Sequence, residues 1–276
     1  MVFGDEQQDG PGEIVRANGI DIYVERRGTG PRVLFLNGSG QTLAGMAPLL
    51  GILAGRFDLM AHDQRGLGRT AVPPGPYAMA DYAADAAAVL DHVGWDRCRV
   101  VGISFGGMVA QELAVTWPDR IERLALLCTS PGGVGTASYP LHELDGLADD
   151  ERAATYLRIL DTRFTPEWLA GHDGDRALVA SMTARRATER PPEQRRGERE
   201  QLEARRHHDV VDRLGAVTCP TLVACGRYDG IAPPANSEAI AARIPGAELR
   251  TYEGGHAFVA QDPAAIPEVM GFLAAG

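Results

Sequence analysis

The sequence predicts an α/β fold built on a mostly parallel, doubly wound sheet. Short apolar runs rich in β-branched residues alternate with helical patterns along most of the 276 residues, as is typical of parallel βαβ units. The alternation stops after the sixth predicted strand and returns after residue 215. Between these points the chain has helical stretches and no clear strand. We therefore expect a helical cap inserted after the sixth strand, within the α/β domain.

The predicted elements follow one another in a regular order. An Asn18-Gly19 pair between two apolar runs is a hairpin signal, and it joins the first two strands. Strands are expected at residues 14–17, 20–25, 32–36, 57–61, 99–103, 121–127, 221–225 and 248–252. Helices are expected at residues 43–53, 79–93, 107–117, 149–160, 195–214, 235–244 and 263–274.

These elements divide the chain into three parts. Residues 1–13 are acidic and glycine-rich and lack an apolar core, so we expect a flexible N-terminus that is not a signal peptide. Residues 14–133 and 216–276 are assigned to the α/β core, and residues 134–215 to the helical cap. No run of about twenty apolar residues occurs, so we expect no membrane-spanning helix.

The composition argues against several classes of function. The formal net charge is −10, from 27 basic and 37 acidic residues, which argues against binding to nucleic acid or to an anionic membrane. The basic residues are all arginines, and a chain without lysine can form neither a Schiff base nor a P-loop. The four cysteines lie in or beside strand-like runs without a C-x-x-C pair. This arrangement predicts buried free thiols and a cytoplasmic protein.

The sequence around Ser104 predicts a nucleophile. The strand at 99–103 runs into the pattern G-I-S-F-G at residues 102–106, and a helical segment follows at once. A G-x-S-x-G pattern between a strand and a helix holds its serine on a sharp, strained turn that exposes the hydroxyl. Side chains at Gly102 and Gly106 would collide across this turn, and Gly107 would let the helix lie close to the sheet.

A serine nucleophile needs a base to take its proton and an acid to orient that base. Sites in open α/β sheets lie beyond the carboxyl ends of the strands, and two such ends carry suitable residues. Asp229 follows the strand at 221–225, and His256 follows the strand at 248–252. Serine, aspartate and histidine in this chain order match the nucleophile, acid and base that accompany such a turn. Asp229 could instead cap its own turn, and His256 could be a polar loop residue.

With these motifs the chain resembles the α/β-hydrolase-fold superfamily, in particular its cap-bearing esterase, lactonase and C–C hydrolase group. The resemblance runs from about residue 14 to the end and is weakest in the cap. Four further motifs carry it: N-G-S-G at 37–40, D-Q-R-G-L-G at 63–68, G-R-Y-D at 226–229 and G-G-H at 254–256. Asn37 stands where a histidine usually precedes the oxyanion-loop glycine, which is similar to the 3-oxoadipate enol-lactonase branch.

The resemblance implies a serine hydrolase with Ser104, His256 and Asp229 as its catalytic triad. It also implies that the backbone N–H groups of Ser39 and Phe105 form the oxyanion hole. The expected substrate is a small-molecule carboxylic ester or lactone, cleaved through an acyl-serine intermediate. We expect no metal and no organic cofactor, and a monomer or a homodimer.

Other functions stay open on the same residues. The same triad would serve C–C bond hydrolysis, thioester hydrolysis or cofactor-free peroxidation. From a different class, the fold could carry a ligand-binding receptor without turnover, or a cofactor-free lyase or pericyclase. A panel of esters, lactones and acyl thioesters separates the hydrolases from one another, and a fluorophosphonate label on Ser104 separates an enzyme from a receptor.

The predicted cap holds two features whose role the sequence leaves open. Residues 185–206 carry eight arginines and five glutamates, which is typical of a solvated helix with i,i+4 ion pairs. A pocket for an acidic substrate is the alternative. Phe164, Trp168, Met182 and His207 are candidates for lining a pocket, although such residues more often lie in a core or at the surface.

Overall fold

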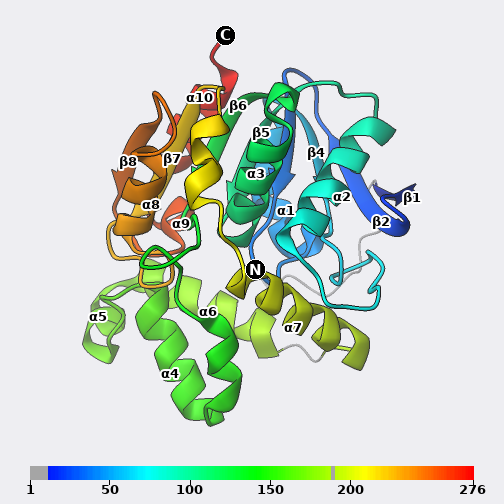
Figure 1. Cartoon of the computed structure of the whole chain (residues 1–276). Helices are drawn as coiled ribbons and strands as arrows, with labels where there is room; N and C mark the ends of the chain where they lie inside the picture. The colour runs from blue at the N-terminus through cyan, green and yellow to red at the C-terminus, as the bar shows by residue number, and fades with distance from the viewer. Residues whose placement is uncertain (1–11, 188–189) are drawn as a thin grey trace.

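The computed structural model describes residues 12–187 and 190–276. Its centre is one eight-stranded sheet with the order β1-β2-β4-β3-β5-β6-β7-β8 (Figure 1). The β1–β2 and β2–β4 pairs are antiparallel, and the pairs from β4 through β3 to β8 are parallel. The predicted fold class, a mostly parallel sheet with helices on both faces, is confirmed.

The elements have the following bounds. The strands are β1 (Gly12–Ala17), β2 (Ile20–Arg27), β3 (Arg32–Leu36), β4 (Asp58–His62), β5 (Cys98–Ile103), β6 (Ile121–Leu127), β7 (Thr221–Gly226) and β8 (Glu248–Tyr252). The α-helices are α1 (Leu43–Ala54), α2 (Met79–His92), α3 (Phe105–Thr116), α4 (Asp149–Leu160), α5 (Pro166–Gly171), α6 (Asp173–Ala187), α7 (Pro192–Arg206), α8 (Pro234–Ala241), α9 (Phe258–Gln261) and α10 (Ala265–Ala274). Three short 3₁₀ turns complete the described elements: η1 (Pro118–Arg120), η2 (Leu141–Gly146) and η3 (Val211–Ala216).

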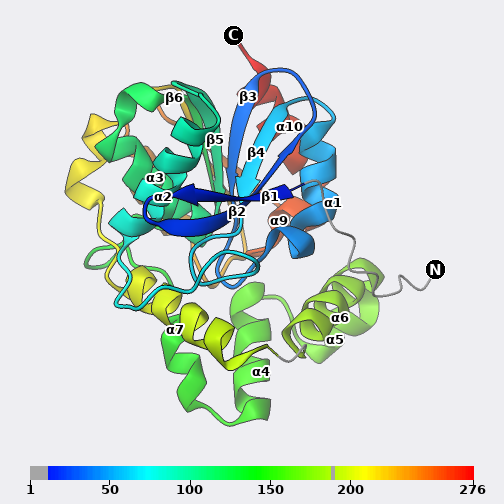
Figure 2. The ribbon, with the colours of Figure 1, turned by 90° about the vertical axis from the view of Figure 1, so that its right-hand side faces the viewer.

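The central strands are apolar on both faces because helices cover both sides of the sheet. In β3, Leu34 and Leu36 belong to the core that includes residues of α2, α3 and α8, whereas Val33 and Phe35 belong to the core that includes residues of α1, α9 and α10. Figure 2 shows the sheet between these layers, with α2 and α3 on one side and α1, α9 and α10 on the other. The strand period of two therefore divides one apolar run between two cores.

The chain between β6 and β7 forms the helical insertion, which holds η2, α4, α5, α6 and α7. In both ribbon views α4–α7 gather at one end of the sheet (Figures 1 and 2). Leu144, Ile159, Leu160 and Phe164 form a separate apolar cluster there, and Ile231 of the loop after β7 completes it. The insertion thus has its own small core and shares it with a loop at the carboxyl end of the sheet.

Several predicted bounds differ from the structure by a few residues. The first strand begins at Gly12, because Gly12 and Glu13 pair with Glu25 and Val24 of β2, so the chain is ordered before the predicted limit of residue 14. The rest of the predicted flexible N-terminus, residues 1–11, lies outside the described residues.

The helix predicted at 195–214 is two elements, α7 and η3. The chain leaves the helix after Arg206 and makes a bridge between Asp209 and Gly132, which pulls it away from the helix axis. The Asp209 carboxylate then accepts a hydrogen bond from the Val211 backbone N–H at 3.1 Å and starts the 3₁₀ turn.

Two expectations from composition can be compared with the structure. Cys98, Cys128, Cys219 and Cys225 are all buried free thiols, as predicted. In the part of the chain that the structure describes, no helix has both the length and the apolar character needed to cross a membrane.

Burial of His62 at the end of β4 predicts a loss of stability in acid. Its side chain is 2% exposed, and burial lowers its pKa from 6.5 to about 4, with Asp85 partly opposing the shift. The folded state therefore resists protonation while the unfolded chain takes up a proton near pH 6.5. The free energy of unfolding therefore has its full value above pH 6.5 and falls as the pH drops toward 4. At pH 5 the expected cost is about 2 kcal/mol.

Urea unfolding at pH 7 and pH 5 measures this effect. Between the two values, the wild-type protein should lose about 2 kcal/mol more free energy of unfolding than His62→Gln. The variant His92→Gln, which removes an exposed histidine from α2, should lose as much as the wild type. Equal losses in the wild type and His62→Gln would contradict the assignment.

Candidate active site

Ser104 lies on a strained turn between β5 and α3. Its φ of 55° and ψ of −115° place a residue with a side chain in a region that such residues rarely occupy. The backbone is held there from both sides. Its N–H donates to the carbonyl oxygen of Leu127 at 2.8 Å, and its own carbonyl oxygen accepts from the Thr129 hydroxyl at 2.8 Å.

Glycines make room for this turn. A Cβ on Gly102 would lie 2.3 Å from the carbonyl oxygen of Gly106, which is the predicted collision across the turn. A Cβ on Gly106 would instead meet the carbonyl oxygen of Leu36 on the neighbouring strand, at 2.1 Å. Gly107 lies against the Thr129 side chain of the loop after β6. Gly106 is therefore required by the approach of β3 and not by the turn itself.

The structure brings the three predicted side chains together in one series of hydrogen bonds. The Ser104 hydroxyl lies 2.8 Å from His256 Nε2, and His256 Nδ1 lies 2.7 Å from Asp229 Oδ2. Because a carboxylate only accepts hydrogen bonds, Nδ1 carries the proton and donates it to Asp229. Nε2 is then free to accept the serine proton. Ser104 and Asp229 are buried, at 8% and 3% exposure.

Asp229 has two separate tasks, one for each oxygen. Its Oδ1 accepts hydrogen bonds from the backbone N–H groups of Ile231 and Ala232, both at 2.8 Å, so it caps its own turn. Its Oδ2 binds His256. The two interpretations of Asp229 are therefore compatible, because the cap fixes the carboxylate that the histidine contacts.

The helical insertion holds the two loops that carry Asp229 and His256. The His256 backbone N–H donates to the carbonyl oxygen of Leu160 at 2.6 Å, and the Gly230 N–H donates to that of Ile159 at 2.9 Å. Both acceptors lie at the end of α4. Gly255 also packs tightly there, since a Cβ on it would lie 2.2 Å from the Leu160 oxygen.

The predicted oxyanion loop lies beside Ser104. A Cβ on Gly38 would be 3.6 Å from the Ser104 Cβ, so the backbone of the 37–40 loop is in contact range of the nucleophile. Phe105 is the first residue of α3, where backbone N–H groups lack helical partners and the helix dipole is positive. Ser39 and Phe105 therefore lie on two segments next to Ser104, and their role as oxyanion-hole donors stays a prediction.

Asn37 fixes the loop in place of the histidine that is usual in the family pattern. The side chain is fully buried, and its amide donates to the carbonyl oxygen of Gln41 at 2.7 Å. Gln64 donates to the Asn37 carbonyl oxygen at 2.6 Å and to its side-chain oxygen at 3.0 Å. These contacts tie the loop to itself and to the 63–68 turn.

The charged residues of the 63–68 turn are structural. Asp63 accepts hydrogen bonds from the backbone N–H groups of Leu43 and Arg69, at 2.7 and 2.9 Å. Arg65 makes a two-bond ion pair with the buried Asp85, with both distances at 2.7 Å. Neither side chain is directed at Ser104 by any of these bonds.

Residues of the insertion close to the site were only partly foreseen. Phe164, Trp168 and Met182 belong to or pack against the apolar cluster of the insertion, whereas His207 is exposed and lines a cavity of about 370 Å³. Gln201 and Arg205 of α7 were missed as individual residues, although both are buried. The arginine-rich run was predicted to be a solvated helix, and its pattern does not distinguish Arg205 from the neighbouring arginines.

No group of three or more side chains suited to metal binding occurs among residues 12–187 and 190–276. The site described above consists of a serine, a histidine, an aspartate and backbone N–H groups. A serine, a histidine and a carboxylate in such a series are the groups that nucleophilic acyl transfer uses.

The fold is a mostly parallel α/β sheet, and a hydrogen-bonded serine, histidine and aspartate lie at the carboxyl ends of its strands. A family model described as the alpha/beta hydrolase fold matches residues 31–263. This match covers most of the chain, so the protein belongs to the alpha/beta hydrolase fold family and is a hydrolase.

Comparison with individual proteins agrees with the family. The chain is 29% identical over 245 residues to a poly(3-hydroxyalkanoate) depolymerase of Ectopseudomonas oleovorans, covering 87% of this chain and 83% of that protein. A hydrolase of Pseudomonas aeruginosa superposes with a TM-score of 0.77 at 29% identity, covering 97% of this chain and 100% of the other. The enol-lactonase of Burkholderia xenovorans shares the fold, with a TM-score of 0.79 at 23% identity over 95% and 100% of the two chains. The expected resemblance to the esterase and lactonase group is thereby confirmed.

Proposed function

We propose that this protein is a serine hydrolase that cleaves a carboxylic ester or a lactone of a small organic molecule. The observation that carries the proposal is the hydrogen-bonded series from Ser104 through His256 to Asp229. Ser104 itself lies on a strained turn beside the 37–40 loop. The similarity to a depolymerase and to a further hydrolase supports hydrolysis as the reaction.

The reaction proceeds in two acyl transfers. His256 Nε2 takes the Ser104 proton while Oγ attacks the carbonyl carbon, and Asp229 stabilises the imidazolium that forms. The N–H groups of Phe105 and Ser39 hold the oxyanion; removal of one such donor typically costs about 3 kcal/mol. The C–O bond to the alcohol breaks as His256 returns the proton to the leaving oxygen. Water, deprotonated by the same histidine, then releases the acid from Ser104.

The cap assignment for residues 134–215 is part of the proposal. It is supported by the position of α4–α7 at the carboxyl end of the sheet and by the contacts of Leu160 and Ile159 with the loops of His256 and Asp229. In this arrangement the insertion covers Ser104 and bounds the space for the substrate.

Labelling with a fluorophosphonate tests the nucleophile without knowledge of the substrate. One phosphonyl adduct per chain should form, and peptide mass spectrometry should place it on Ser104, because only an activated serine attacks the phosphorus. The variant Ser181→Ala, at an exposed position on α6, should label as the wild type does. An unlabelled, folded wild-type protein would contradict the proposal and favour a non-catalytic receptor.

A substrate panel then separates the related reactions. The p-nitrophenyl esters and simple lactones should turn over faster than acyl thioesters and vinylogous ketones. Preferred turnover of a thioester or of a C–C bond would replace the ester assignment while leaving the same triad in use.

A further inference from the structure

Helix α7 presents two buried polar side chains, Gln201 and Arg205, one helical turn apart on one face. Gln201 is 0% exposed and Arg205 is 6% exposed. Four residues along a helix correspond to about 6 Å along its axis, so the two side chains are neighbours. Gln201 reaches the oxyanion loop, because its Oε1 accepts a hydrogen bond from the Gly40 backbone N–H at 2.8 Å.

Both side chains keep donors without an acceptor in the described part of the chain. The amide nitrogen of Gln201 is buried and makes no hydrogen bond there. Arg205 donates from Nη1 to the carbonyl oxygen of Tyr139 at 2.7 Å, while its Nε and Nη2 are buried without a partner. Buried donors usually find acceptors, so this set of N–H groups indicates a ligand rich in oxygen.

The Nε and Nη2 atoms of Arg205 have no partner within residues 12–187 and 190–276, and other arginines of this protein bind carboxylates through the same two atoms. Arg163 binds Asp161 through Nε and Nη2 at 2.9 and 2.7 Å, and Arg26 binds Asp58 through the same two atoms at 2.8 and 2.7 Å. These planar two-bond pairs match the geometry of a carboxylate. Among the described residues, no carboxylate lies within 4.0 Å of Arg205.

The charge of Arg205 is also without a close counter-ion. Burial lowers its pKa to about 10, with Asp229 acting in the opposite direction, so the guanidinium is charged at neutral pH. The Asp229 carboxylate already accepts three hydrogen bonds, from Ile231, Ala232 and His256. A buried cation without a paired anion is unfavourable, which a bound anion would relieve.

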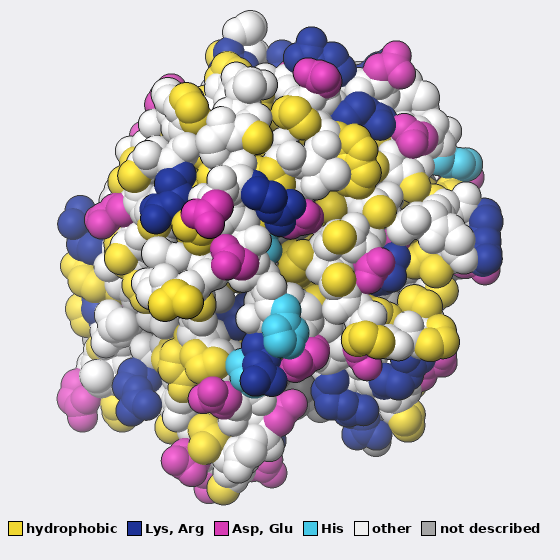
Figure 3. Space-filling view, in the orientation of Figure 1, with side chains coloured by type: hydrophobic (Ala, Val, Ile, Leu, Met, Phe, Trp, Pro, Cys, Tyr) yellow, Lys and Arg dark blue, Asp and Glu magenta, His cyan; other side chains and the backbone are white. Residues whose placement is uncertain are grey.

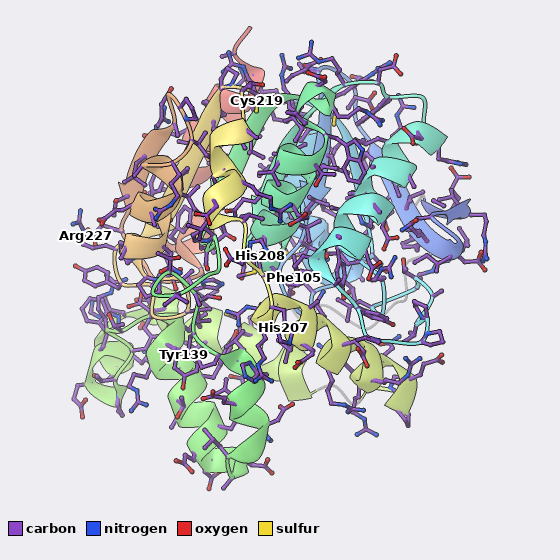
Figure 4. All side chains as sticks on the ribbon, in the orientation of Figure 1. Phe105, Tyr139, His207, His208, Cys219 and Arg227 are labelled. Carbon is purple, nitrogen blue, oxygen red and sulfur yellow. The ribbon has the colours of Figure 1, made fainter. Side chains whose placement is uncertain are left out.

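Arg205 borders a cavity between α7, the loop after β6 and helix α3, which begins next to the nucleophile. The cavity of about 370 Å³ is lined by Arg205, His208 and Ser130 and also by Met108. Met108 lies one helical turn after Ser104 on α3, and its backbone N–H donates to the Ser104 carbonyl oxygen at 3.2 Å; Ser104 itself does not line the cavity. Figure 4 shows Phe105, His208 and His207 at the junction between the core and α7, and Figure 3 shows histidine and basic side chains around a hollow on that face.

We propose that Arg205 binds a carboxylate of the substrate through Nε and Nη2, with the Gln201 amide as a further donor. The ester or lactone hydrolysed at Ser104 then carries an acidic group at the end of a short chain. This assignment rests on the proposed function of Ser104 and names the substrate class for it.

Matched ester pairs test the assignment. The acidic probes are the mono-p-nitrophenyl esters of adipic, pimelic and suberic acid, and the neutral probes are their methyl esters. For at least one chain length, wild-type kcat/KM should be at least about tenfold higher for the acid. Arg205→Met should lower kcat/KM about 100-fold for that acid and less than about threefold for the methyl ester, the scale of a charged two-bond contact. Arg205→Lys should restore only part of the preference, because lysine cannot make the two-bond contact.

A control separates the local contact from the general charge. Arg199 lies on the same helix with an exposed side chain, so Arg199→Met removes an equal charge. It should leave the ratio of acid to methyl ester unchanged. Equal ratios in the wild type, Arg205→Met and Arg205→Lys would overturn the assignment, even where hydrolysis itself depends on Ser104.

Binding in the absence of turnover distinguishes this inference from the proposed function. In a Ser104→Ala background, calorimetry with monomethyl pimelate should detect binding that Arg205→Met weakens at least about tenfold and Arg199→Met does not. If Arg205→Met fails to fold by circular dichroism, Arg205→Lys takes its place. Turnover that persists in Ser104→Ala would refute the function, whereas binding insensitive to Arg205 would refute only the carboxylate contact.

Discussion

Replacement of Ser104 by alanine should lower kcat for ester hydrolysis by about 10⁶-fold, the size of effect that loss of a serine nucleophile has in a serine protease. The hydroxyl oxygen is the atom 2.8 Å from His256 Nε2, so alanine leaves the histidine without a hydroxyl group to deprotonate. The fold should persist, because the bonds that hold residue 104 come from its backbone N–H and carbonyl groups.

Steady-state assays on the best p-nitrophenyl ester measure the loss, and thermal melting reports the fold. Ser181→Ala serves as the matched variant, since it removes an exposed hydroxyl from the insertion and should retain full activity. A Ser104→Ala enzyme with more than about one per cent of wild-type kcat would show that another group carries the reaction.

Asp229→Asn should lower kcat by about 10⁴-fold through the tautomer of His256. The Oδ1 position faces two backbone N–H groups, of Ile231 and Ala232, so the amide oxygen of asparagine must occupy it. The amide N–H₂ is then directed at His256 Nδ1, which must act as an acceptor. The proton moves to Nε2, and that nitrogen can no longer accept the serine proton.

The same assay measures this loss, with fluorophosphonate labelling as a second readout that should slow in parallel. Asp119→Asn, at an exposed position in η1, provides the comparison and should behave as the wild type. A decrease of less than about tenfold in Asp229→Asn would mean that another group orients His256, or that the histidine is not the base.

The position of the three site residues was accessible from the sequence because each follows a strand. Parallel strands β5, β7 and β8 end at one edge of the sheet, so residues just beyond them converge. Ser104 lies in a G-x-S-x-G pattern, whose glycines are required by close contacts. Asp229 and His256 are the acidic and basic residues that follow β7 and β8. The strand pattern thus predicted proximity without any knowledge of strand order.

Gln201 and Arg205 could not be predicted as buried in this way. A helix with many charges has no sequence feature that tells which arginine faces the protein, because that depends on how the helix docks. Here docking is fixed by Gly197, where a Cβ would lie 2.0 Å from the Gly66 carbonyl oxygen, and by the contact of Gln201 with Gly40. Both contacts join segments far apart in the sequence, so the residue pattern of the helix alone cannot predict them.

The hydrogen bonds from His256 and Gly230 to the end of α4 limit how much of the chain can be deleted from this enzyme. Removal of the helical insertion would leave both backbone N–H groups without the carbonyl oxygens of Leu160 and Ile159. Water would take the place of these oxygens, and the loops of the acid and the base would lose two contacts that fix their backbone. The sheet and its flanking helices are therefore not a separable catalytic module. A minimal version of this enzyme must retain α4 as far as Leu160.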